Sequence, residues 1–163
     1  MKKQLLCIAC LCFVAFAHAQ AFKGKGDQKF QIGPSFQDGG TGITGSYDFG
    51  AGENISFGVT STYVLGLADH IDADFGDRFD VKARFNANLC SVIGISEFDL
   101  YPGLSFSLKN FGAHVGARYF FSEGFGVFAE AGLPIAKYDT GHLSPAEELH
   151  NQFVFNFGAS FNL

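Results

Sequence analysis

The feature that most constrains this chain is an alternation of apolar and polar side chains with a period of two. It is clearest over residues 78–89, where every second side chain is apolar and the intervening ones are polar or charged. The apolar set is Phe79, Val81, Ala83, Phe85, Ala87 and Leu89, and the polar set is Asp80, Lys82, Arg84, Asn86 and Asn88. Successive side chains of an extended strand point to opposite faces, so this pattern predicts a strand with one apolar and one polar face.

The same alternation recurs along most of the chain and predicts eight strands. Their expected ranges are 28–37, 42–49, 54–65, 78–89, 98–108, 111–121, 125–136 and 151–163. The connectors 66–77 and 137–150 are long, acidic and polar, and the others are shorter. Outer-membrane barrels keep short turns on the periplasmic side and long loops outside. With a periplasmic N-terminus, both long connectors are expected outside.

The fifth and sixth predicted strands allow a test of pairing. A two-residue turn at 109–110 would pair Leu108 with Phe111 on the apolar face and Ser105 with His114 on the polar face. Both faces are then sorted correctly by one register, whereas a slip of one residue would mix them. We therefore predict a tight hairpin at this point.

The predicted strand lengths suit a membrane. Eight strands of about 10 residues, tilted by about 45°, span roughly 23 Å, close to an apolar band of about 25 Å. The eighth strand can pair with the first, and closure leaves no unpaired edge in lipid. We therefore predict an all-β fold, an eight-stranded antiparallel up-and-down transmembrane β-barrel. A soluble sandwich or lipocalin-like barrel also alternates, but bulky aromatics up to the strand ends and mixed charges on the polar face weigh against it.

Residues 1–19 have the pattern of a secretory signal. Lys2 and Lys3 precede the uncharged apolar stretch 5–16, and 17–19 is Ala-His-Ala, with small residues at the cleavage site. We expect a cleaved signal peptide over 1–19 and the barrel domain over 20–163. Cysteines at 7, 10 and 12 leave a lipoprotein signal as the alternative reading. After cleavage only Cys90 remains, so no intramolecular disulfide can form.

Net charge limits the classes of partner. Without the two signal lysines, 9 basic residues stand against 16 acidic ones. Nucleic-acid binding needs a basic patch, so no nucleic acid is expected. We expect the lipid bilayer as the main partner, a monomeric state, no cofactor and an unidentified ligand, if any, at the long connectors.

Four segments resemble those of known outer-membrane barrels. The C-terminal run NQFVFNFGASFNL resembles the terminal strand that outer-membrane assembly machinery reads, although it ends in Leu163 where Phe is usual. The other segments are AFKGKGDQKF (21–30), GDRFDVKARFNANL (76–89) and LKNFGAHVGARYFF (108–121). With these the chain resembles a family of small bacterial outer-membrane barrels of unknown function. The resemblance implies location in the bacterial outer membrane and contact with its assembly machinery, and it supplies no catalytic residues.

Charges on the polar faces are the candidate site. They are nearly balanced, and charges removed from water must be paired. An eight-stranded barrel is just wide enough inside for side chains. We therefore predict a structural ionic network that fills the lumen, and a gated ion path past the same residues is the alternative. The predicted members are Asp80, Lys82, Arg84, Asp99, Arg118 and Glu130, with Asp48 as a further candidate.

One arrangement resembles a nucleophile, a base and an orienting carboxylate, namely Ser105, His114 and Glu130. The expected register places Glu130 opposite Gly116, two positions away from His114. All three would also face the lumen, away from lipid substrates. No catalytic residue is therefore predicted.

The two long connectors carry possible metal ligands. Residues 69–77 are rich in carboxylates, and 142–150 contains two histidines and two glutamates, but neither has the ligand spacing of a known site. No metal site is predicted. The favoured function is a structural or surface-interaction role without catalysis, a narrow pore or transporter is the alternative, and a lipid-active enzyme is third.

Overall fold

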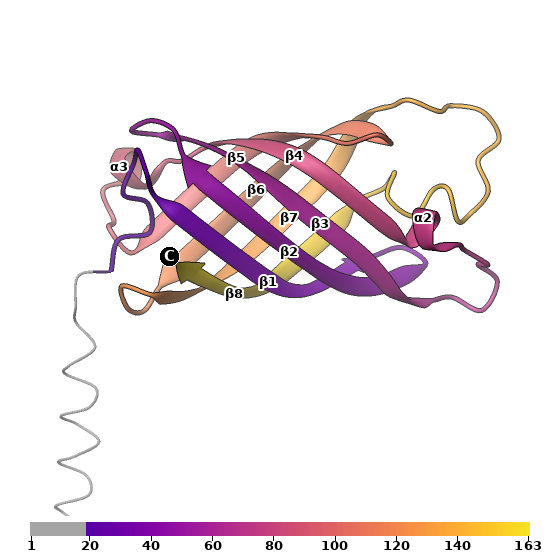
Figure 1. Cartoon of the computed structure of the whole chain (residues 1–163), viewed down its shortest axis with the longest axis horizontal. Coiled ribbons are helices and arrows are strands. Elements are labelled where there is room, and N and C mark those ends of the chain that lie inside the picture. The colour runs from indigo at the N-terminus through magenta and orange to yellow at the C-terminus, as the bar shows by residue number, and fades with distance from the viewer. Residues whose placement is uncertain (1–18) are drawn as a thin grey trace, which may run out of the picture.

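The computed structural model describes residues 19–163, which form a closed antiparallel barrel of eight strands in chain order (Figure 1). The strands are β1 Gln28–Gln37, β2 Gly40–Gly50, β3 Ile55–Leu67, β4 Phe79–Ala87, β5 Phe98–Phe106, β6 Asn110–Phe120, β7 Phe125–Lys137 and β8 Val154–Asn162. β8 pairs with β1 and closes the ring, so the predicted eight-stranded up-and-down barrel is confirmed. The body of the predicted signal peptide lies outside the described residues.

Two short helices were not predicted. α2 (Phe75–Arg78) follows β3 and α3 (Cys90–Ile93) follows β4, and each has four residues. A single turn is too short to leave a helical period in the sequence, which is why pattern analysis missed both. Within residues 19–163, no helix is long and apolar enough to cross a membrane.

In the structure, the apolar side chains of the alternating pattern face outward and the polar ones face the lumen. Phe57 on the outer surface is 54% exposed, whereas Arg118 in the lumen is 1% exposed. Large apolar side chains cover the outside of all eight strands, and the buried set is mostly polar or charged. A soluble protein has the opposite arrangement, so this exterior suits a nonpolar surrounding.

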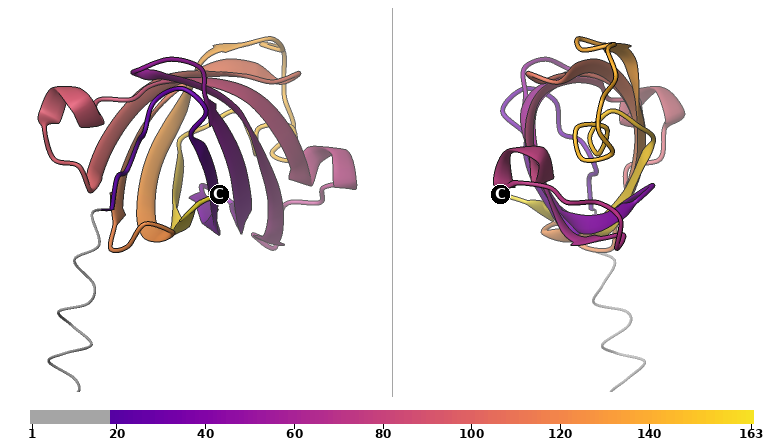
Figure 2. Two further views of the ribbon diagram at one scale, coloured as in Figure 1. Left: turned by 60° about the vertical axis from the view of Figure 1, so that its left-hand side comes forward. Right: turned by 90° about the vertical axis from the view of Figure 1, so that its right-hand side faces the viewer.

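Both mouths of the barrel are covered by chain. The terminal end, which contains the described N-terminal segment and the C-terminus, is entered by residues 19–27 (Figure 1). There the amide of Ala21 donates to the carbonyl of Ser96 at 2.7 Å, and Phe22 packs in a buried cluster with Cys90 and Phe120. The opposite end, called the loop end below, is crossed by the connection from β7 to β8 (Figure 2). The side-chain amide of Gln37 donates to the Leu149 carbonyl of this connection at 2.5 Å.

The predicted register of β5 with β6 is wrong by two residues. Phe106 pairs with Phe111, and residues 107–110 form a longer turn than the two-residue turn expected. The Ser107 hydroxyl accepts from the amides of Lys109 at 3.1 Å and Asn110 at 3.3 Å, which stabilises this turn. A shift of two keeps every side chain on its predicted face, because the side-chain period is also two.

Packing in the lumen explains the observed register. His114 lies opposite Gly103, and Tyr101 lies opposite Gly116. A Cβ on Gly103 would lie 2.4 Å from Nε2 of His114, and a Cβ on Gly116 would lie 2.2 Å from the Tyr101 ring. Bulky lumen side chains therefore need glycine on the facing strand. The predicted register of β6 with β7, with Gly116 opposite Glu130, is confirmed.

The predicted start of β8 at residue 151 is also wrong, since the strand begins at Val154. The two polar side chains before it close the loop end. Oδ1 of Asn151 accepts from Nδ2 of Asn110 at 2.8 Å, and Nε2 of Gln152 donates to the Asp38 carbonyl at 2.6 Å. Because Gln152 and Phe153 continue the polar and apolar alternation of β8, the sequence pattern extends the strand too far toward its N-terminus.

Candidate functional site

All six charged residues proposed for the lumen point into it. β4 supplies three of them because alternate positions of one strand share a face. All but Lys82, whose side chain is 22% exposed, are buried. The six are Asp80, Lys82, Arg84, Asp99, Arg118 and Glu130.

The first group within the lumen is centred on Arg84. Its Nη2 lies 2.6 Å from Oε2 of Glu130, and its Nε lies 3.2 Å from Oδ1 of Asp48. Glu130 therefore pairs with Arg84, although its register partner on β6 is Gly116, two residues from Arg118. Strand register specifies only neighbours on adjacent strands, whereas the long guanidinium side chain of Arg84 reaches across the lumen from β4 to β7.

The second group is centred on Arg118. Its Nη2 and Nε lie 2.8 and 3.1 Å from Oδ2 of Asp99, and its Nη1 lies 3.6 Å from Oδ2 of Asp48. Asp99 also accepts from Nδ2 of Asn88 at 2.8 Å and from the amide of Cys90 at 3.0 Å. Asp48 thus contacts both guanidinium groups and links the two groups into one network.

Tyr101 joins the same network through its ring. The ring centroid lies 4.7 Å from Cζ of Arg118 and 5.6 Å from Cζ of Arg84, both within cation–π range. The hydroxyl accepts from Nε2 of Gln31 at 3.3 Å. Tyr101 shares the polar face of β5 with Asp99, but an aromatic residue carries no charge to be balanced, so the balance of charges in the sequence does not reveal it.

A third group lies toward the loop end and a fourth toward the terminal end. Nζ of Lys82 lies 3.6 Å from Oδ2 of Asp80 and donates to Oδ1 of Asn110 at 3.2 Å. At the terminal end the buried Lys29 pairs with Asp27, a pair absent from the predicted set. The alternation of β1 puts Lys29 inward, and that parity was the signal that could have revealed it.

The arrangement of Ser105, His114 and Glu130 does not resemble a catalytic triad. Nε2 of His114 lies 2.7 Å from Oδ1 of Asn86 and 3.3 Å from Nη2 of Arg84. Ser105 lies opposite Gly112, so the predicted opposition of Ser105 and His114 is wrong. Among the hydrogen bonds of residues 19–163, none joins these two side chains. Within residues 19–163, no three side chains of His, Cys, Asp or Glu lie close enough together to hold a metal ion.

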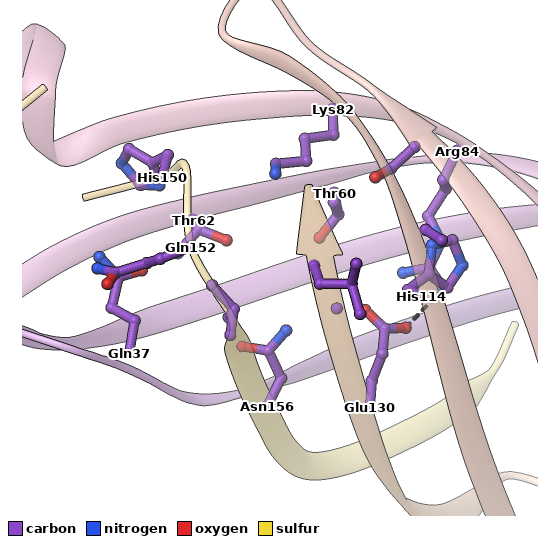
Figure 3. Close-up of a pocket in the computed structure, with 15 residues that line it drawn as sticks. Gln37, Thr60, Thr62, Lys82, Arg84, His114, Glu130, His150, Gln152 and Asn156 are labelled. Carbon is purple, nitrogen blue, oxygen red and sulfur yellow. Dashed lines mark hydrogen bonds and ion pairs between the residues drawn. The ribbon is translucent and has the colours of Figure 1, made fainter. Parts of the chain in front are cut away.

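Above the Arg84–Glu130 pair, toward the loop end, lies a polar space called the lumen cavity here (Figure 3). Its volume is about 50 Å³. The β7–β8 connection forms its roof through His150 and Gln152, and Asn156 of β8 lies in its wall. A cavity of this size and polarity has room for a few water molecules or one small polar guest.

A closed eight-stranded barrel with an apolar exterior and an ion-paired lumen is a transmembrane β-barrel. A solved structure described as "De novo design of transmembrane beta-barrels" is similar with a TM-score of 0.61 at 11% identity, covering 86% of this chain and 98% of that one. The chain belongs to the Family of unknown function (DUF6646), which matches residues 12–163. The resemblance to a family of unknown function with an eight-stranded barrel fold is thereby confirmed.

A second solved structure is the solution NMR structure of Outer Membrane Protein G from Pseudomonas aeruginosa. It is similar with a TM-score of 0.42 at 12% identity, covering 87% of this chain and 99% of that one. No curated protein matches the chain.

Proposed function

We propose that this protein is an integral protein of the bacterial outer membrane whose lumen is closed to ions, and that it acts at its loop end in a structural or surface-interaction role without catalysis. The observation that carries the proposal is the continuous chain of ion pairs across the lumen. It runs from Glu130 through Arg84, Asp48 and Arg118 to Asp99.

The burial of this chain supports a plug and not a hydrated pore lining. The side chains of Arg118 and Asp99 are 0% exposed, and those of Arg84 and Asp48 are 2% and 1% exposed. Each guanidinium group contacts two carboxylates. A permeating ion would have to break contacts between buried charges, and leaving one partner uncompensated is strongly unfavourable. Both mouths are also covered, by residues 19–27 and by the β7–β8 connection.

The exterior supports the membrane location. Lipid cannot satisfy backbone hydrogen bonds, and a closed ring of strands satisfies them internally. The expected signal over residues 1–19 would direct export, and the aromatic-rich β8 resembles the strand that assembly machinery reads. With the N-terminus in the periplasm, the terminal end is periplasmic and the long connections at the loop end face the cell exterior.

Orientation can be tested by labelling intact cells with a membrane-impermeant maleimide. In a Cys90→Ala background, Asp139→Cys at the loop end should label, and Glu123→Cys at the terminal end should label only after lysis; both positions are exposed. Recovery of the protein in the soluble periplasmic fraction, without detergent, would contradict the membrane location.

The closed lumen can be tested in a planar bilayer. The refolded protein should show no steady conductance. Stable single-channel openings whose ion selectivity reverses on Glu130→Lys would show that the lumen is a conduction path and would exclude the plug.

A further inference from the structure

We propose that the lumen cavity is a binding site for a small uncharged polyol, held beneath the β7–β8 connection. This inference goes beyond the proposed function, which requires a closed lumen but no binding site inside it.

The cavity is enclosed by side chains of several elements. Its floor is the Arg84–Glu130 pair, and its roof is the segment of the β7–β8 connection that contains His150 (Figure 3). Thr60 and Thr62 of β3 line one wall and Asn156 of β8 lines another. Apart from the floor, the lining is dominated by neutral hydrogen-bonding groups. Such walls suit a molecule that both donates and accepts hydrogen bonds.

Three polar atoms on this lining have no hydrogen-bond partner among residues 19–163. They are Oδ1 of Asn156, Oε1 of Gln37 and Nε2 of His150. Asn156 is 8% exposed and His150 is 3% exposed, so bulk water does not satisfy them. Buried polar groups without a partner are unfavourable and uncommon. Their convergence on one cavity points to a guest, and the two amide oxygens require a guest with hydrogen-bond donors.

The charges around the cavity are already neutralised. Lys82 contacts Asp80 and Asn110, and Arg84 contacts both Glu130 and Asp48. A charged guest would therefore enter a buried space without a counter-charge, which is strongly unfavourable. An uncharged guest avoids this penalty. Hydroxyl groups fit best, because they can donate to the amide oxygens and to the hydroxyl oxygens of Thr60 and Thr62, whose own protons are donated to the Gly45 carbonyl and to Thr44.

Entry must occur at the loop end, through the roof. Among residues 19–163, four hydrogen bonds donated by amide side chains hold the roof to the rim, and one of them is the bond from Nδ2 of Asn110 to Oδ1 of Asn151 described above. Gln37 donates to the Leu149 carbonyl at 2.5 Å, Asn110 donates to the His150 carbonyl at 2.8 Å, and Gln152 donates to the Asp38 carbonyl at 2.6 Å. Release of these bonds would open the cavity without breaking any strand pairing.

The test uses isotope-labelled, refolded protein in detergent micelles and three molecules of nearly equal size. Glycerol is neutral, glycerate is an anion, and serinol (2-amino-1,3-propanediol) is a cation. The readout is the NMR signal of the Asn156 side-chain amide, assigned by its loss in Asn156→Leu. Glycerol should shift this signal saturably, and both charged analogues should bind at least about tenfold more weakly, because burying an uncompensated charge is unfavourable.

Asn156→Leu should weaken glycerol binding at least about tenfold through loss of a hydrogen-bonding partner. Binding in this variant is read from other cavity signals. Asn162→Leu, on the same strand outside the cavity lining, should bind as the wild type does. No saturable shift with glycerol up to about 0.1 M, a very weak affinity, would mean that the cavity holds only water and would overturn the proposal. Tighter binding of either charged analogue would overturn the assignment to uncharged polyols.

Discussion

Nη2 of Arg84 on β4 lies 2.6 Å from Oε2 of Glu130 on β7, so this ion pair joins strands that are three positions apart around the barrel. It ties opposite walls of the lumen together and forms the floor of the lumen cavity. Because both side chains are buried, removing one partner leaves the other as an uncompensated buried charge.

The first prediction concerns the pairing of Glu130. Glu130→Gln should lower the free energy of unfolding by about 3–5 kcal/mol, because Arg84 loses a buried partner. Combining it with Arg84→Met should recover part of that loss. Denaturant unfolding of the refolded barrel and a double-mutant cycle measure the coupling. The same cycle with Arg118→Met should give a smaller coupling energy, and equal couplings would contradict the observed pairing.

The second prediction concerns the space above Gly116. Gly116→Ala should destabilise the barrel by about 1–3 kcal/mol, because its Cβ would overlap the Tyr101 ring. Gly124→Ala is the control, since nothing lies within 4 Å of its added Cβ, and it should change stability by no more than about 0.5 kcal/mol. In a Tyr101→Leu background the cost of Gly116→Ala should fall, and an unchanged cost would show that the overlap is not the cause.

The third prediction concerns membrane depth. Val115 lies at the centre of β6 on the outer surface, and Tyr119 lies near the terminal end of the same strand. Val115→Arg should cost about 2–4 kcal/mol in lipid vesicles, whereas Tyr119→Arg should cost about 0–1 kcal/mol. Equal costs would mean that β6 does not cross the bilayer as proposed.

The fourth prediction concerns pH and the roof of the lumen cavity. Burial, and after it the nearby charge of Lys109, lowers the pKa of His150 from 6.5 to about 4. When the roof is open, His150 takes up a proton below its ordinary pKa of 6.5. When the roof is closed, His150 stays neutral until about pH 4. Closure is therefore fully stable above pH 6.5 and loses up to about 3 kcal/mol as the pH falls to 4.

Hydrogen exchange of the amides of residues 149–152, measured between pH 7 and 4 and corrected for intrinsic rates, would detect this opening. His150→Gln should remove the pH dependence in that window. His142→Gln, at an exposed position of the same connection, should leave it unchanged. Opening that is independent of pH in the wild type would exclude His150 as its cause.

The fifth prediction concerns the cover at the terminal end. Burial raises the pKa of the Cys90 thiol, whose Sγ also donates to the Ser96 carbonyl at 3.5 Å. Alkylation of the refolded protein by iodoacetamide at pH 8 should therefore be slow, since the thiolate is the reactive form. Phe22→Ala should raise the rate by about tenfold or more, through loss of the cover over Cys90. An unchanged rate would show that residues 19–27 do not shield the thiol.

Much of the architecture could be predicted because it depends on side-chain parity, which is a local property. The alternation in β4 placed Phe79 outward and Asp80 inward, whatever the rest of the chain does. The alternation in β5, β6 and β7 likewise places Asp99, Arg118 and Glu130 in the lumen, whichever strands pair. The register of β6 with β7 followed as well, because the turn that joins these two strands is short.

Only the tertiary structure decided which lumen charges meet. Arg84 contacts Glu130 across the barrel, and this depends on the tilt of the strands and the width of the lumen, neither of which is encoded in any single strand. The β5–β6 register was likewise set by the Ser107 hydroxyl in the turn and by Tyr101 packing over Gly116. The covers at both mouths are irregular chain without a period, so their positions arise only from long-range hydrogen bonds such as that from Gln37 to the Leu149 carbonyl.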